Sequence, residues 1–407
     1  MKNLFNHNIM FSSLLVRNYR VYWVGMFISL IGTWIQIVAQ SWLVFELTKS
    51  AFLLGVVGFL SSIPVFLLSL FGGVVADRMN KRNILIFTQT VFMFLAFSLG
   101  ALTQLKIITP AQIMCIALLD GIVMAFDAPS RQAIVVELVG KKHLMNAIAL
   151  NSVAFNSSRI IGPALAGILV ASIGMSGCFY ANGVSFLAVL IALFFIKIDH
   201  GLIRDTHSGL MKDLTEGLNL IKNNRVILIL ITMVAVTSLF GFSYVILMPI
   251  FANNVLKVGV KGMAMLMSAS GLGALIAALI LARLGDFQYK GKLLILSSLI
   301  FSLALILFSL SKVYLLSLVA LALVGWGSVT AIAIINTILQ TIVSDEFRGR
   351  VMSAFMFTFA GTMPFGNLIA GSIAQAWGVS LTVLIGGIFC AVFFIIINVF
   401  YPGIRKI

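Results

Sequence analysis

The chain has 407 residues, of which 61% are hydrophobic and only 10% are charged. A soluble domain carries about 25% charged residues, so this composition excludes a globule with a water-covered surface. Runs of about 20 apolar residues recur along the whole length, long enough to cross a bilayer as helices, whereas a membrane barrel would show short alternating segments. The sequence therefore predicts an all-α polytopic membrane protein.

Twelve transmembrane helices are expected, and short polar segments separate them. The longest polar segment, 198–225, divides the chain into an N-terminal bundle (1–197) and a C-terminal bundle (226–407), each of six helices. Within it, apolar residues at helical spacing predict an amphipathic helix on the membrane surface, although a linker that only tethers the halves explains it equally well. The expected spans are 20–45, 51–75, 84–104, 110–130, 145–171, 178–197, 226–252, 260–283, 293–311, 314–337, 351–372 and 379–400.

The net charge of +15 suggests nucleic acid at first sight, but its distribution has another explanation. Of the 27 Lys and Arg residues, 21 lie in the segments that an even number of spans places on the side of the termini. The positive-inside rule puts that side in the cytoplasm and removes any need for a nucleic-acid partner. Five lie on the other side: Lys49, Lys106, Lys257, Lys261 and Lys312.

No residue pattern in the chain indicates a metal, a cofactor or a catalytic centre. The three Cys are isolated in apolar stretches, and the four His form no cluster. A membrane-embedded enzyme would need paired catalytic groups within the spans, so we expect no enzyme activity and no cofactor.

The segment "GGVVADRMNKRN", 72–83, concentrates charge between two apolar spans. It is either a solvated turn that only fixes topology or a segment with a role in function.

The two halves of the sequence also resemble each other. "VELVGKKHLMNAIALN" (136–151) and "VSDEFRGRVMSAFMFT" (343–358) occupy the same place between the fourth and fifth spans of each half. Parallel repeats of six helices are typical of transporters that bind substrate between the halves, near the bilayer midplane.

With "AFDAPSRQAIVVELV" leaving span four and "RIIGPALAG" in span five, these motifs make the chain resemble the major facilitator superfamily. More narrowly, it resembles the bacterial drug-efflux and siderophore-exporter branch. The resemblance implies two pseudo-symmetric six-helix bundles and secondary active transport by alternating access. It also implies a conformational latch after helix two, in which Asn80 replaces a usual Gly and is expected to keep the tight turn in left-handed backbone. The latch residues are Gly73, Asp77, Arg78, Lys81 and Arg82.

Ionisable residues at membrane depth are functional candidates by default. Asp120 in span four and Arg159 in span five are candidates for proton coupling, and the alternative is a permanent ion pair that fixes helix packing. At the end of span four, Asp127, Arg131 and, beyond them in the loop, Glu137 are candidates for an inner gate. The alternative for Asp127 and Arg131 is a local pair that stabilises a helix end.

A polar stripe on span one faces either a water-filled cavity or another helix. With weaker equivalents in the second half, it gives the substrate-cavity candidates Thr33, Gln36, Gln40, Ser243, Tyr244 and Asn336. Span five carries Gly162, Pro163 and Gly167, which form either a hinge or a kink for close packing. The resemblance to drug–proton antiporters, which carry a similar Gly-Pro signature, favours antiport.

These observations predict a proton-driven exporter of an amphiphilic small molecule in the bacterial inner membrane. The substrate is expected to be a siderophore or a drug-like compound, the surroundings a lipid bilayer, the energy source the proton gradient and the functional unit a monomer. The alternative is uptake, or movement of lipid between leaflets, on the same fold.

The predicted orientation has a direct test in intact cells. Cysteine introduced at Asn80 should be shielded from an impermeant thiol reagent, because its segment lies in the cytoplasm, whereas cysteine at Lys106 should react. Permeabilised cells provide the control for reactivity. Labelling at position 80 in intact cells would show that the predicted orientation is wrong.

Overall fold

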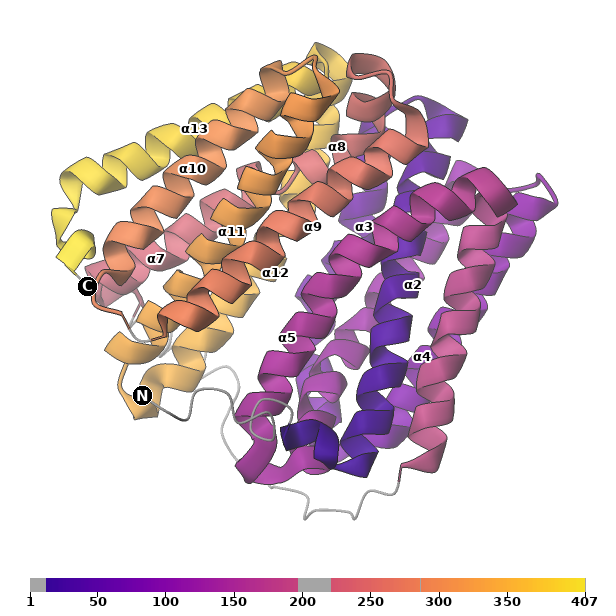
Figure 1. The fold of residues 1–407 in the computed structure, drawn as a ribbon, viewed down its shortest axis with the longest axis horizontal. Helices are drawn as coiled ribbons and strands as arrows, with labels where there is room; N and C mark the ends of the chain where they lie inside the picture. The colour runs from indigo at the N-terminus through magenta and orange to yellow at the C-terminus, as the bar shows by residue number, and fades with distance from the viewer. Residues whose placement is uncertain (1–11, 197–220, 286, 407) are drawn as a thin grey trace. The chain divides into compact units, whose positions relative to one another are not determined.

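The computed structural model describes residues 12–196, 221–285 and 287–406, and within these ranges it contains helices and no strands. Most of the predicted surface helix in 198–225 lies outside the described residues. Figure 1 draws the elements, which are η1 (Ser12–Leu15), α2 (Arg17–Thr48), α3 (Ala51–Arg78), α4 (Lys81–Gln104), α5 (Pro110–Phe195), α7 (Arg225–Val236), η2 (Thr237–Gly241), α8 (Tyr244–Ile250), η3 (Phe251–Val255), α9 (Gly259–Leu284), α10 (Lys290–Leu310), α11 (Tyr314–Ile342), α12 (Asp345–Trp377), α13 (Val379–Phe400) and η4 (Pro402–Lys406).

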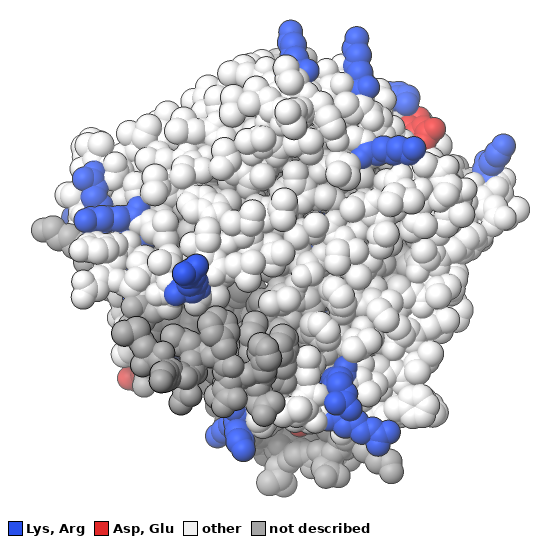
Figure 2. Space-filling view, viewed as in Figure 1, with Lys and Arg blue, Asp and Glu red and all other residues white. Residues whose placement is uncertain are grey.

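The predicted class of an all-α polytopic membrane protein is confirmed. In the described ranges, nine helical stretches are long and apolar enough to cross a membrane, and one of them is the 86-residue α5. On the face that Figure 2 draws, the Lys and Arg side chains lie toward the margins and a broad surface between them carries no charged residue, as expected for a surface that faces lipid. The count of twelve spans stays a prediction.

Helix α5 contains three consecutive helices that turn at two glycines. Gly140 has φ 64° and Gly174 has φ 73°, backbone angles that a side chain disfavours. The stretches 110–139, 141–173 and 175–195 correspond to the expected spans four, five and six, and the first two are longer than expected. The loop expected between spans four and five is wrong, because the helix continues to residue 139 and the turn needs only a single glycine.

The expected seventh span, 226–252, is an interrupted helix. Two short π-helices, η2 and η3, flank α8, and Pro249 lies inside α8. A π turn widens the helix and leaves some backbone groups without their usual partners. Within the first of these turns, Ser238 Oγ donates to the carbonyl of Phe359 on α12 at 2.8 Å. This contact joins the interrupted span to its neighbour.

The chain divides into two compact units. The first contains residues 1–43 and 63–205, and the second contains 44–62 and 206–407. The division resembles the two predicted halves, except that 44–62, the end of α2 and the start of α3, belongs to the second unit. There, Gln375 Oε1 on α12 accepts from the backbone N–H of Ala51 at 2.9 Å. Within the second unit, α11 packs against both α9 and α10.

Candidate functional site

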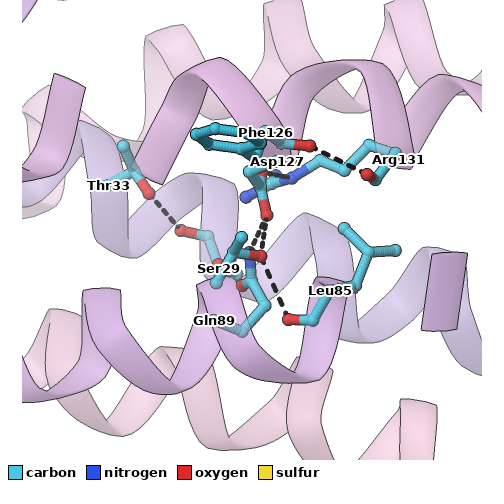
Figure 3. Close-up of polar contacts among 9 residues, drawn as sticks. Ser29, Thr33, Leu85, Gln89, Phe126, Asp127 and Arg131 are labelled. Atoms are coloured by element: carbon cyan, nitrogen blue, oxygen red, sulfur yellow. Dashed lines mark hydrogen bonds and ion pairs between the residues drawn. The ribbon is translucent and has the colours of Figure 1, made fainter. Parts of the chain in front are cut away.

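The most deeply buried charge among the described residues is Asp127, whose side chain has no solvent exposure. Its Oδ1 accepts from Thr88 Oγ1 and from Gln89 Nε2, each at 2.7 Å, and both donors lie on α4. Its Oδ2 forms an ion pair with Arg131 Nε, one helical turn further along α5. Figure 3 shows Gln89, Asp127 and Arg131 converging between the two helices.

This arrangement follows from the local sequence. Residues four apart on a helix are neighbours, so Asp127 and Arg131 meet despite Pro129 between them. A buried carboxylate is tolerated when a counter-charge and hydrogen-bond donors surround it, and removal of one partner from such a pair costs about 3–5 kcal/mol. Arg131 therefore compensates the charge of Asp127 within α5, and the Thr88 and Gln89 donors connect this carboxylate to α4.

Three buried polar atoms close to this pair lack a hydrogen-bond partner among the described residues. They are Tyr22 OH and Ser29 Oγ on α2, and Gln89 Oε1 on α4. The Ser29 carbonyl, in contrast, accepts from Thr33 Oγ1 at 2.9 Å. Because buried polar groups nearly always find a partner, bound water is the expected one here.

The charged segment after α3 holds several helix ends of the first unit. Lys81 Nζ forms an ion pair with Glu137 Oε1 at 2.8 Å, so Glu137 joins this segment and not the Asp127 pair. Arg82 donates through Nε to the Leu193 carbonyl at 2.6 Å and through Nη2 to the Phe194 carbonyl at 3.2 Å. A guanidinium at the last carbonyls of a helix satisfies acceptors that have no partner within the helix.

The expected left-handed turn at Asn80 is wrong. Asn80 has φ −64° and caps α4, because its side-chain oxygen accepts from the N–H groups of Arg82 and Asn83. Asn is among the best residues at this position, which explains the departure from Gly. The closely packed glycine is Gly72, whose hypothetical Cβ would collide with the Ala125 carbonyl, whereas Gly73 faces open space.

Asp77 and Arg78, the remaining predicted latch residues, are both exposed at the end of α3. Among the described residues the structure gives Asp77 no ion pair. Their role in a latch stays a prediction.

The structure does not join the two candidates for proton coupling. In the described part of the chain no ion pair links Asp120 to Arg159, and both residues are half-buried. The Arg159 guanidinium lies 6.0 Å from the centre of the Trp34 ring, within reach of a cation–π contact. The permanent ion pair considered from the sequence is therefore not the arrangement found.

The polar stripe on α2 contacts another helix at Gln36. Gln36 is buried, and its Oε1 accepts from Asn182 Nδ2 on α5 at 2.7 Å. For Gln36 a helix interface explains the polarity, whereas Thr33 and Gln40 are half-buried and stay candidates for the cavity.

The cavity candidates of the second unit are mostly bonded within it. Tyr244 is buried, and its hydroxyl lies 3.1 Å from Ser270 Oγ. Ser243 Oγ donates to the Phe240 carbonyl at 3.1 Å. Asn336 is half-buried and accepts from Gln340 Nε2 at 2.6 Å, so its own amide N–H groups stay available.

The Gly-Pro segment packs tightly within the first unit. Gly162, Pro163 and Gly167 are all buried. A Cβ at Gly162 would lie 2.9 Å from the Ile31 carbonyl oxygen, so only glycine permits this approach of α5 to α2. Close packing accounts for Gly162, and a hinge at this place stays a prediction.

Sequence reasoning missed Thr88, Gln89 and Asn182, which bond to residues that it singled out. Each is a polar residue inside an apolar span, and that signal could have found them. Within the described ranges no group of three or more His, Cys, Asp or Glu could hold a metal ion.

Comparison with known proteins places the chain among membrane transporters. Residues 9–404 match the family described as transmembrane secretion effector. The staphyloferrin A transporter of Staphylococcus aureus is 30% identical over 376 residues, which cover 91% of this chain and 92% of that protein. The enterobactin exporter EntS of Shigella flexneri is 26% identical and covers 82% and 79%. The multidrug efflux pump Tap of Mycolicibacterium fortuitum is 22% identical and covers 87% and 88%.

Solved structures show the same fold at low sequence identity. A D-xylose–proton symporter superimposes with a TM-score of 0.75 at 12% identity, covering 95% of this chain and 99% of that one. A bacterial homologue of the human lysosomal transporter Spinster gives 0.73 at 13% identity, covering 96% and 98%. The chain therefore belongs to the transmembrane secretion effector family of the major facilitator superfamily, and it is a multi-pass membrane transporter and not an enzyme.

Proposed function

We propose that this transporter exports an amphiphilic small molecule, a siderophore or a drug-like compound, across the bacterial inner membrane. The observation that carries the proposal is the 30% identity to a staphyloferrin A transporter over nearly the whole chain. Two further relatives are named as an enterobactin exporter and a multidrug efflux pump, so export recurs among the names. Both termini lie in the cytoplasm in this proposal, and one chain forms the functional unit.

Export is tested in cells that lack their own exporters for the compounds used. Expression of the chain should raise the secreted amounts of staphyloferrin A or enterobactin, or lower the retention of ethidium. Each compound is measured in the medium and in the cells, and cells with an empty vector provide the baseline. Faster entry of a compound from the medium would contradict export and favour uptake. If expression changes the transport of none of the three compounds, the proposed substrate class is contradicted and only the assignment as a transporter stands.

In this proposal the energy comes from proton entry, and Asp120 carries the proton. Its carboxyl is half-buried in the middle of a span and has no ion pair among the described residues, unlike Asp127, whose charge Arg131 and two further donors compensate. A neutral carboxyl is placed in an apolar environment at a lower free-energy cost than a carboxylate. Arg159 lies on the adjoining part of α5, where it would favour loss of the proton if it approached Asp120.

Asp120→Asn should abolish accumulation driven by a pH difference, because an amide cannot exchange the proton. The compound that the cell assay identifies is supplied to proteoliposomes, and its accumulation against its concentration gradient is measured. Exchange without a gradient should persist, since the amide is close to the carboxyl in size. Asp120→Glu, which keeps the acid, should retain part of the pH-driven activity. Full pH-driven accumulation by Asp120→Asn would sink the role of this residue.

Asp77 is proposed to act in a conformational latch, because its exposed carboxylate lies next to a segment whose cations Lys81 and Arg82 already hold two other helix ends. Asp77→Asn should reduce export at least tenfold while the amount of inserted protein is unchanged. Glu46→Gln, which neutralises an exposed acid near the C-terminal end of α2, serves as the matched control. Equal export by the two variants would return the segment to a turn that only fixes topology.

A further inference from the structure

A pocket of about 490 Å³ opens within the second unit, where the turn between α2 and α3 meets the end of η3 and the junction of α12 and α13. These helix ends carry few cations and are the ones predicted to face outward. Polar and apolar side chains share its wall. Its wall includes Lys49, Ile250, Asn254, Gln375 and Trp377.

The two side-chain amides in this pocket have their oxygens occupied and their NH₂ groups left. Gln375 Oε1 already accepts from Ser50 Oγ at 3.0 Å and from the N–H groups of Ala51 at 2.9 Å and Phe52 at 3.3 Å, which leaves its NH₂ group. Asn254 Oδ1 accepts from Asn253 Nδ2 at 2.9 Å, which again leaves the NH₂ group. Among the described residues that line the pocket there is no Asp or Glu.

Lys49 adds a positive charge to these donors. Its ammonium lies 4.6 Å from the centre of the Phe45 ring, and no carboxylate among the described residues is within ion-pair distance. The ammonium therefore has three N–H groups available to a ligand. An ammonium beside two amide NH₂ groups suits an oxygen-rich anion.

The backbone of Lys49 is a second, independent feature. Its φ of 50° is left-handed, and in the described ranges only Lys49, Lys106 and Lys257 share this feature without being glycine. Each follows the end of a helix, where Gly or Asn would adopt the conformation at lower cost. Of the three, only Lys49 lines the pocket, so the residue with the less favourable backbone is also the one that brings a positive charge to it.

We propose that this pocket binds an oxyanion, a carboxylate or a phosphate group, through Lys49, Asn254 and Gln375, with Trp377 and Ile250 against the apolar part of the ligand. Two sources share this chemistry: a carboxylate of the exported compound as it leaves, and the phosphate of an anionic lipid headgroup. The first source rests on the proposed function. The second does not.

The test uses the full chain in a zwitterionic detergent, with citrate as the soluble probe and phosphatidylglycerol as the lipid probe. Binding should appear as a saturable change in tryptophan fluorescence, and Trp377→Phe should remove this change while calorimetry still detects binding. Sodium chloride at equal ionic strength controls for screening.

Lys49→Asn should weaken binding at least tenfold, and because Asn tolerates left-handed backbone, this variant should fold as well as the native chain. Lys106→Asn relieves the same backbone conformation away from the pocket and should bind as the native chain does. Asn254→Asp, which places a carboxylate in the wall, should also weaken binding. Equal affinity of Lys49→Asn and Lys106→Asn would overturn the proposal.

The two sources separate by the probe that binds. Saturable citrate binding, lost in Lys49→Asn, supports a site for soluble carboxylates, and slower export by the same variant would assign it to the exported compound. Binding of phosphatidylglycerol alone supports a lipid site. Both results stand whether or not the export assay succeeds, and binding of neither probe contradicts the proposal.

Discussion

The first unit depends on how a carboxylate can exist inside an apolar bundle. Asp127 has no contact with solvent, so its charge must be compensated by protein groups. Arg131 supplies the opposite charge from the same helix, and Thr88 and Gln89 supply donors from the neighbouring helix. The position of α4 relative to this part of α5 is therefore fixed by electrostatics as well as by packing.

The same constraint explains where the other charges lie. Lys81, Arg82 and Glu137 are placed at the ends of helices, where water and terminal carbonyls lower the cost of a charge. Within the segment 72–83, Lys81 and Arg82 therefore have a structural role besides any role in transport. This dual use means that loss of transport in a charge variant is informative only when insertion of the protein is measured alongside.

The fold class followed from the sequence because apolar runs of sufficient length can only be spanning helices. Which polar side chains contact each other between helices was much harder to predict. Gln36 and Thr33 lie on the same polar stripe, yet only Gln36 meets an amide, Asn182, which is 146 residues away in the chain. Such a contact depends on which helices become neighbours and how they rotate, and neither property is encoded in the period of one helix.

Local chemistry was predictable in kind but not always in form. Asn80 was expected to replace glycine in a turn, but it replaces glycine as a helix cap, and both roles suit a short amide side chain. Likewise, the pair of Asp127 and Arg131 followed from their spacing, whereas the donors on α4 did not. Polar residues inside apolar spans were the unused signal.

The division of α2 and α3 between the two units has a consequence for how the protein can be assembled. Residues 44–62 pack with the second unit, and Gln375 accepts from the start of α3, while the rest of both helices belongs to the first unit. A gene split within the long polar segment 198–225 would yield an N-terminal fragment in which residues 44–62 had lost their packing surface. Two separately translated fragments could therefore restore a functional protein only if they associated in the membrane, because the N-terminal fragment cannot finish folding without the second unit.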